Sequence, residues 1–369
     1  MKLTRFSLAV GALAASSLAL TACGGSSGGN DAGSGGPGTG STSLSGNLDG
    51  AGSTAQQAAM QAWQSGFQDA NSDVTVNYDP VGSGGGREQF LQGGVQFAGS
   101  DAPLTSDELT QSQSVCAGGT GAIDLPVYVS PIAVAFNVNG VTDLQLDADT
   151  IAKIFAGKIT TWDDPAIAAQ NSGAKLPSTS ITPVHRSDDS GTTQNFTDYL
   201  SKASTSWTYP PAQTWPVKGG EGAEGTSGVI QAIKSGDGTI GYADESQVGD
   251  LGVVAVKVGS SFAKPTAEAA AKVAEESSPT PGRPAGDLSI DVKRDTTTDG
   301  AYPIILISYQ VVCTEYTKAA DAALVKAFET YVVSADGQSA AAQAAGSAPL
   351  SDALRQKVTA SIALIKAGS

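Results

Sequence analysis

Residues 186–196, Arg-Ser-Asp-Asp-Ser-Gly-Thr-Thr-Gln-Asn-Phe, combine residue types that could do chemistry. One arginine, Arg186, and two adjacent carboxylates, Asp188 and Asp189, stand directly ahead of a run of small hydroxyl and amide residues. Such a stretch could be the nucleophile turn of an enzyme, a carboxylate cage for a cation, or a cradle for an anion.

Three turns in the chain share one pattern, a glycine turn that carries a hydroxyl side chain directly ahead of a predicted helix. They are Ser53 and Thr54 in GAGST (50–54), Ser83 in GSGGG (82–86), and Ser190 to Thr192 in SGT. The first N–H groups of a helix lack partners and lie at the positive end of its dipole, so each turn could bind an anion. Each alone could equally be a helix cap. Three of them, with an arginine beside the third, predict an oxyanion site.

Enzymatic and cation-binding alternatives fit the stretch less well. A serine hydrolase would need His185, the only histidine, as the base for Ser190, with Asp188 or Asp189 as the third group, but the G-x-S-x-G turn is absent. A calcium loop would alternate its carboxylates, as D-x-[DN]-x-[DN]-G, rather than place two side by side.

Nucleotide, metal and cofactor chemistry are also disfavoured. None of the glycine turns matches the P-loop or the dinucleotide-binding pattern. A phosphoester hydrolase would need a dense Asp/His cluster for its metals, and one histidine does not supply it. We therefore expect no cofactor, no metal and no catalytic residue. The full-length charge of −15 loses Lys2 and Arg5 with the leader and becomes −17, which opposes binding to nucleic acid or an anionic membrane surface.

The N-terminus predicts export and anchoring. Residues 1–22 have a basic start and an apolar run too short to span a bilayer, which is typical of a signal peptide. Leu20-Thr21-Ala22-Cys23 resembles a bacterial lipobox, which implies a lipid on Cys23; the alternative is a secretory signal followed by a chance cysteine. Residues 23–46 are almost all Gly, Ser and Thr and predict a flexible tether.

Cys116 and Cys313 are the two other cysteines. In an exported protein such a pair favours a disulfide over zinc, which would want four ligands.

The rest of the chain alternates β-rich and helical segments, which predicts α/β domains with mainly parallel sheets. The predicted strands are 74–79, 125–138, 252–258 and 302–313, and the predicted helices include 264–276 and 316–334. The Pro/Gly-rich residues 277–286 predict a surface loop.

Several motifs, in this order along the chain, resemble the phosphate-binding proteins of Pst-type ABC importers. They are GAGST (50–54), VGSGGGREQF (81–90), FAGSDAPL (97–104), IFAGKITTWDDPAI (154–167), HRSDDSGT (185–192) and GTIGYAD (238–244). The resemblance implies a type II periplasmic-binding-protein fold, with two lobes that close on the ligand about a hinge. We expect lobe I to comprise 47–129 plus 300–369 and lobe II to comprise 130–299.

The resemblance also implies a ligand set for phosphate. Its hydroxyl and N–H donors would be Thr54, Ala55, Ser83, Ser190, Gly191 and Thr192. Arg186 would be the cationic donor, held in place by Asp188, and Asp101 would accept a proton from the ligand. Asp189, where the family often has glycine, puts an extra carboxylate near the anion.

The expected protein is a monomeric, lipid-anchored receptor on the outer face of the cell membrane that delivers phosphate to an ABC permease. The leading rival ligand is another tetrahedral oxyanion, which a proton-accepting Asp101 disfavours.

Overall fold

The computed structural model describes residues 44–368, so the predicted signal peptide, Cys23 and nearly all of the tether lie outside the described residues. The longer strands are β1 Gly46–Gly52, β2 Val74–Asp79, β3 Phe97–Ser100, β4 Ala122–Asn137, β5 Asp143–Leu146, β6 Thr182–Arg186, β8 Thr239–Asp244, β9 Gly252–Val258 and β13 Ile305–Cys313. The shorter strands are β7 Glu221–Ala223, β10 Ser261–Ala263, β11 Ser278–Pro279, β12 Ile290–Asp291, β14 Glu315–Tyr316 and β15 Lys366–Ala367.

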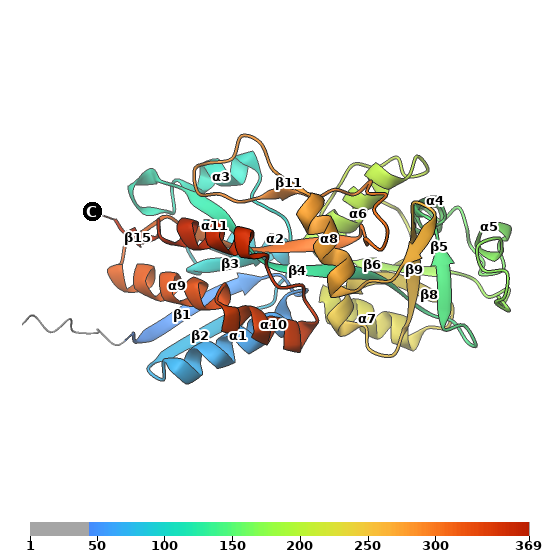
Figure 1. The fold of residues 1–369 in the computed structure, drawn as a ribbon, viewed down its shortest axis with the longest axis horizontal. Helices are drawn as coiled ribbons and strands as arrows, with labels where there is room; N and C mark the ends of the chain where they lie inside the picture. The colour runs from blue at the N-terminus through green and yellow to red at the C-terminus, as the bar shows by residue number, and fades with distance from the viewer. Residues whose placement is uncertain (1–43, 369) are drawn as a thin grey trace, which may run out of the picture. The chain divides into compact units, whose positions relative to one another are not determined.

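The helices alternate with these strands along the chain (Figure 1). They are α1 Gln57–Ala70, α2 Ser83–Leu91, α3 Ser106–Ser112, α4 Ala148–Phe155, α5 Pro165–Ala168, α6 Gly191–Ala203, α7 Gly225–Ser235, α8 Ala267–Glu276, α9 Ala319–Val332, α10 Ala335–Ala345 and α11 Asp352–Ile362, with short 3₁₀ turns η1 Ala117–Gly119 and η2 Glu245–Gln247.

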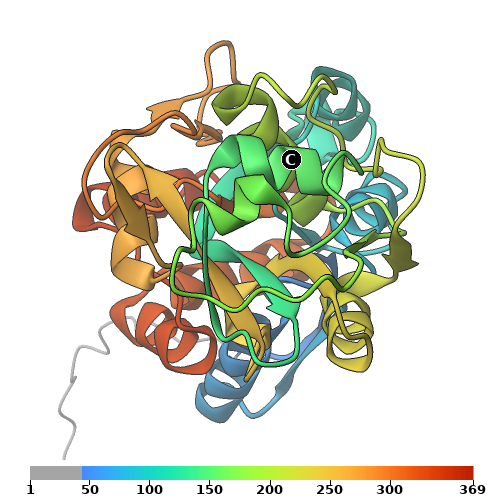
Figure 2. The same cartoon turned by 90° about the vertical axis from the view of Figure 1, so that its right-hand side faces the viewer.

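Two strands, β4 and β13, connect the halves of the described chain. The first half of β4 pairs with β13, which in turn pairs with β3 next to β1 and β2. The second half of β4 pairs with β8, which leads to β6 and β7, and with β9, which leads to β5 and β10. In Figure 1, β1 to β3 lie at one end of β4, and β5, β6, β8 and β9 lie at the other. In Figure 2 this second group faces the viewer.

The mainly parallel sheet predicted from the sequence is in fact mixed. Parallel pairs occur on both sides, between β1 and β2, β1 and β3, β6 and β8, and β5 and β9. The antiparallel pairs that join the halves come from β4 and β13. The reason is that both crossing strands are buried on both faces, so they show the same unbroken apolar run as parallel strands and the sequence does not distinguish the two.

The predicted segments largely appear. Strands β2 and β9 have the predicted bounds, and α8 and α9 occupy the predicted helical segments. Strand β1 already includes Gly46, which was assigned to the tether, because Gly46 pairs with Val74 of β2. Within residues 44–368 no helix is long and apolar enough to cross a membrane.

The disulfide prediction is confirmed. Cys116 and Cys313 are joined, with 5.4 Å between their Cα atoms and 197 positions between them in the chain. Cys313 pairs with Ala122, so the bond lies where β4 begins and β13 ends.

The segment 277–286 lies at the surface, as predicted, and Arg283 anchors it to the rest of the chain. Its Arg283 makes ion pairs with the buried Asp124 and with Asp287, and donates to the Leu104 carbonyl at 2.6 Å.

Candidate functional site

The predicted first-lobe ligands follow neighbouring strands. β1 and β3 are parallel, so their carboxyl ends meet at one edge, where Thr54 and Asp101 follow the two strands. Open α/β sheets bind ligands outside this edge. Gly52 permits the close approach, because a Cβ there would lie 1.9 Å from the Gly99 carbonyl oxygen and its φ is +145°. Ser83 is the first residue of α2 and is 1% exposed.

The second-lobe ligands stand at the junction of β6 and α6. Arg186 is the last residue of β6, and Ser190 caps α6 by accepting from the Thr193 N–H at 3.1 Å. Gly191 and Thr192 are therefore the first residues of the helix, where N–H groups lack intrahelical partners. The sequence-predicted helix start is confirmed.

The two sets of turns lie against each other. The Thr192 hydroxyl donates to Asp101 Oδ2 at 3.0 Å. The Gly84 N–H donates to the Asp189 carbonyl at 3.0 Å. A Cβ at Gly191 would lie 2.7 Å from Ser83 Oγ and 2.8 Å from Asp101 Cβ, so only glycine fits there. The tertiary structure thus gathers hydroxyl groups and helix N-termini with Arg186, Asp188 and Asp101.

Arg186 is buried and its direction is fixed by Asp188. The guanidinium is 3% exposed, and its Nε donates to Asp188 Oδ1 at 2.7 Å while Nη2 pairs with Oδ2. Partial burial would raise the pKa of Asp188, but the hydrogen bonds and charge of Arg186 outweigh it and the pKa lies below its ordinary value. Asp188 therefore stays ionised at neutral pH, and a bidentate pair of this kind orients the arginine.

Asp101 is held from three directions and is 3% exposed. Its Oδ1 accepts from the Ser308 hydroxyl at 2.6 Å and its Oδ2 from Thr192, while its N–H donates to Ser83 Oγ at 3.1 Å. Because all its side-chain partners are donors, the carboxylate keeps its acceptor character.

An aromatic stack lies behind the second-lobe turn. The Tyr242 hydroxyl accepts from the Arg186 N–H at 3.3 Å and shares a 2.7 Å hydrogen bond with Thr193. Its ring stacks on Phe196 with 4.4 Å between centroids. Burial raises the pKa of Tyr242 to about 12, so its hydroxyl keeps its proton and remains able to donate.

Two predicted donors already have partners within the protein. The Ala55 N–H donates to Ser53 Oγ at 3.1 Å. The Thr54 hydroxyl lies 2.9 Å from the Thr226 hydroxyl and accepts from the Thr226 N–H at 3.1 Å. Thr226 belongs to the first turn of α7, behind Gly225, so it repeats the glycine and hydroxyl pattern of the other turns.

Sequence reasoning missed Thr226, Ser308 and Asn195. The GTSG stretch that opens α7 was a usable signal for Thr226. Ser308 was visible as a hydroxyl inside the apolar run of β13. Nothing in the sequence singled out Asn195, which reaches the Asp101 carbonyl at 2.6 Å.

The residues that a serine hydrolase would use as its triad make other contacts here. His185 stacks on Trp215 at 5.1 Å between centroids, and its Nδ1 lies 2.9 Å from the Arg186 carbonyl oxygen. Ser190 caps α6, and Asp189 accepts from the Thr214 hydroxyl at 2.7 Å. In residues 44–368 no group of three or more His, Cys, Asp or Glu side chains could hold a metal ion.

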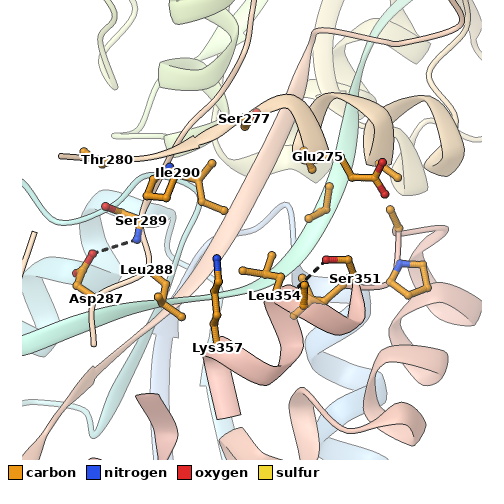
Figure 3. Close-up of a pocket in the computed structure, with 18 residues that line it drawn as sticks. Glu275, Ser277, Thr280, Asp287, Leu288, Ser289, Ile290, Ser351, Leu354 and Lys357 are labelled. Atoms are coloured by element: carbon orange, nitrogen blue, oxygen red, sulfur yellow. Dashed lines mark hydrogen bonds between the residues drawn. The ribbon is translucent and has the colours of Figure 1, made fainter. Parts of the chain in front are cut away.

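A separate cavity of about 340 Å³ lies beside α8 and α11 (Figure 3). Lys357 points from α11 toward Ser289 and Ile290, with Leu354 beside it and Glu275 on α8. The cavity contains none of the predicted phosphate ligands.

Comparison with known proteins identifies the family of this chain. The family model described as a PBP superfamily domain matches residues 37–336. Phosphate-binding protein PstS 2 of Mycobacterium tuberculosis is 37% identical over 98% of this chain and 99% of its own length. Phosphate-binding protein PstS 3 of Mycobacterium leprae is 36% identical over 89% of this chain and 90% of its own length.

Solved structures share the fold. A high-affinity periplasmic phosphate-binding protein (PfluDING), solved with bound phosphate, has a TM-score of 0.69 and 25% identity, and the match covers 85% of this chain and 93% of that one. The phosphate-binding protein of Stenotrophomonas maltophilia has a TM-score of 0.64 at 22% identity, over 86% of this chain and 94% of that one, and supports the fold alone. The chain therefore belongs to the PBP superfamily and, within it, to the PstS family of phosphate-binding proteins.

Proposed function

We propose that this chain is an extracytoplasmic receptor that binds inorganic phosphate between two lobes and delivers it to an ABC permease. The single observation that carries the proposal is the meeting of Asp101, at the carboxyl edge of β3, with Thr192 and Gly191, at the N-terminus of α6. A carboxylate and helix N-termini at one point suit a tetrahedral oxyanion that still carries a proton.

In this proposal each residue has a defined role. The donors are the hydroxyl and N–H groups of Thr54, Ala55, Ser83, Ser190, Gly191 and Thr192. Arg186 neutralises the anion, Asp188 orients Arg186, and Asp101 accepts the proton of the ligand. Hydrogen bonds to a charged partner contribute about 1.5–3 kcal/mol each, so a few of them reach the roughly −8 kcal/mol of micromolar binding even after ordering costs.

The proposed lobes meet where β4 passes from one group of strands to the other. We assign residues 47–129 and 300–369 to lobe I and residues 130–299 to lobe II. β4 and the segment that enters β13 would then form the hinge, because β4 pairs with strands of both groups and the chain returns to lobe I just before β13. A ligand bound by turns from both lobes stabilises the closed state over the open one.

The same proposal covers anchoring and assembly. Lipid on Cys23 would hold a monomeric receptor at the outer face of the cell membrane, and residues 24–45 would act as the tether. The short tether suits delivery to a permease in the same membrane.

The test is calorimetric titration of residues 43–369 with phosphate, sulfate and arsenate. We expect micromolar or tighter binding of phosphate, comparable binding of the isosteric arsenate, and no measurable binding of sulfate. Folded protein that gives no heat with phosphate, or that binds sulfate as well as phosphate, contradicts the proposal.

A further inference from the structure

Asn195, in the second turn of α6, connects the two sides of the candidate site without belonging to the predicted ligand set. Its Nδ2 donates to the main-chain carbonyl of Asp101 at 2.6 Å and to that of Gly191 at 2.9 Å. The residue is 8% exposed. Its amide therefore links the start of α6, from which the anion would receive its donors, to the residue that would accept the proton of the ligand.

Arg294 fixes the direction of this amide. The arginine is 3% exposed, and its Nη2 donates to Asn195 Oδ1. A guanidinium can only donate, so it can meet only the oxygen of the amide. Both amide hydrogens of Asn195 are then directed at carbonyl oxygens, which is the orientation that the contacts with Asp101 and Gly191 require.

Arg294 is itself anchored to α6 and to the segment that enters β13. Its Nε pairs with Asp198 Oδ2 at 2.9 Å. Its Nη1 donates to the carbonyl of Pro303 at 3.1 Å and to that of Ile305, the first residue of β13, at 2.7 Å. The Asn195 amide is thus held in place by a buried arginine at the start of a crossing strand.

We infer that Asn195 is a positioning residue that latches the two lobes together, and this inference rests on the proposed function. Asn195, Asp198 and Arg294 all fall in the proposed lobe II, so the bonds among these three persist when the lobes separate. The carbonyls of Pro303 and Ile305, to which Arg294 also donates, lie where the chain enters the proposed lobe I, next to the proposed hinge. The bond to the Asp101 carbonyl joins lobe II to lobe I and must break on opening. The latch is therefore already oriented in the open receptor and adds its bond only on closure, so it slows the release of phosphate.

The surroundings of Asn195 allow it to be tested by truncation. A cavity of about 280 Å³ is lined by Asp101, Gln194, Asn195 and Arg294, among others. Water in this cavity can replace a removed amide, so the fold should tolerate the loss. Gln194 lies one position away and lines the same cavity, and its buried Oε1 has no hydrogen-bond partner. Gln194→Ala is therefore the matched control.

Stopped-flow release of phosphate from residues 43–369 tests the latch. For Asn195→Ala we expect a release rate about 10-fold faster and an association rate within about 2-fold of the parent. This factor corresponds to one ordinary hydrogen bond. The preference for phosphate over sulfate should remain, because the amide does not contact the proton-accepting carboxylate. Gln194→Ala should release phosphate at the parental rate.

The outcomes separate the latch from the proposed function. If the parent chain binds no phosphate, the proposed function fails. If the parent binds phosphate but Asn195→Ala releases it at the parental rate, the latch fails. A lower melting temperature without phosphate, with release unchanged, shows a merely structural role and also overturns the latch. If Asn195→Ala does not fold, Asn195→Ser replaces it, because the serine hydroxyl is too short to reach both carbonyls. We expect the same faster release of phosphate from this variant, and release at the parental rate would overturn the latch.

Discussion

Phosphate and sulfate have the same tetrahedral shape, and near neutral pH they differ in whether a proton remains on an oxygen. The proposed site distinguishes them through one residue, Asp101. Donors already occupy both of its oxygens, Ser308 on one side and Thr192 on the other, so the carboxylate can offer only further lone pairs. Phosphate can donate to these lone pairs, whereas sulfate would bring one more acceptor against them. At the scale of the residue, selectivity is therefore a question of donors and acceptors rather than of size.

Asp101→Asn should relax this selectivity. The amide can turn an N–H group toward the ligand, which removes the repulsion of sulfate, while the other donors still bind phosphate. We expect the ratio of phosphate to sulfate affinity to fall by at least about 10-fold, since sites built on such a hydrogen bond discriminate by up to 10⁴ or more. Calorimetry with both anions measures the ratio, and a variant that rejects sulfate as strongly as the parent does would argue against this role for Asp101.

Asp188→Ala should weaken phosphate binding although it removes a negative charge near an anion. Without Asp188 the guanidinium of Arg186 loses its bidentate partner and its fixed direction. We expect the dissociation constant to rise about 10-fold or more, in line with the value of a charge-assisted hydrogen bond. Tighter binding by the variant would mean that charge, not orientation, is what Asp188 contributes.

The same pair predicts a pH dependence of stability. The pKa of Asp188 is lower in the folded state than its ordinary value of 3.8, so the folded state favours the ionised form. The resulting stabilisation is present above the ordinary pKa and is lost as pH falls through the lowered one. Asp188→Asn should thus lower the melting temperature at pH 6, and this decrease should become smaller as the pH falls below about 4. An equal decrease at every pH would exclude this linkage.

At the scale of the element, α9 contains a group that opposes folding. Glu329 is fully buried among the apolar residues of this helix, and neither carboxylate oxygen has a hydrogen-bond partner. Burial raises the pKa of Glu329 well above 4.5, so the folded state favours the protonated form. Within the described chain, this carboxyl makes no hydrogen bond that would offset the cost of burying it.

Replacing Glu329 with the similarly sized Met should stabilise the protein. An unsatisfied buried polar group costs about 1–3 kcal/mol, and methionine fills the same space without it. For an acid whose folded pKa is raised, the further cost of keeping its proton appears as pH rises above the unfolded value of about 4.5. The gain in melting temperature should therefore be larger at pH 8 than at pH 4. Glu329→Gln, polar but unable to ionise, serves as the control and should remove the pH dependence alone; a destabilised Glu329→Met variant would contradict the argument.

At the scale of the whole molecule, the proposed closing motion depends on β4 and β13, and the disulfide lies at one end of this pair. β4 and β13 pass between the two groups of strands, and the register of their pairing shifts between Ser308 and Tyr309. This irregularity lies beside the hydroxyl that holds Asp101, so the candidate site and this strand pair share a residue. The disulfide lies at the carboxyl end of β13, away from the proposed hinge.

Removing the disulfide should therefore affect stability and not binding. With Cys116→Ser and Cys313→Ser together, we expect the free energy of unfolding to fall by about 2–4 kcal/mol, because the bond closes a loop of nearly two hundred residues in the unfolded chain. The phosphate dissociation constant should stay within about 2-fold. Denaturant unfolding and calorimetry measure the two quantities, and a large loss of affinity would mean that the bond supports the hinge.

The sequence by itself determined what depends on local chemistry. Glycine turns that carry a hydroxyl ahead of a helix are visible in the local sequence, so Thr54, Ser83, Ser190 and Gly191 were identifiable, and the apolar runs located β4 and β13. The resemblance in the spaced motifs supplied the roles of Asp101 and Arg186. Only the tertiary structure decided that β4 and β13 run antiparallel, since a strand buried on both faces has the same pattern in either direction. Only it brought Asn195, Thr226, Ser308 and Arg294 to the candidate site, because their partners lie up to 207 positions away and no local pattern encodes such contacts.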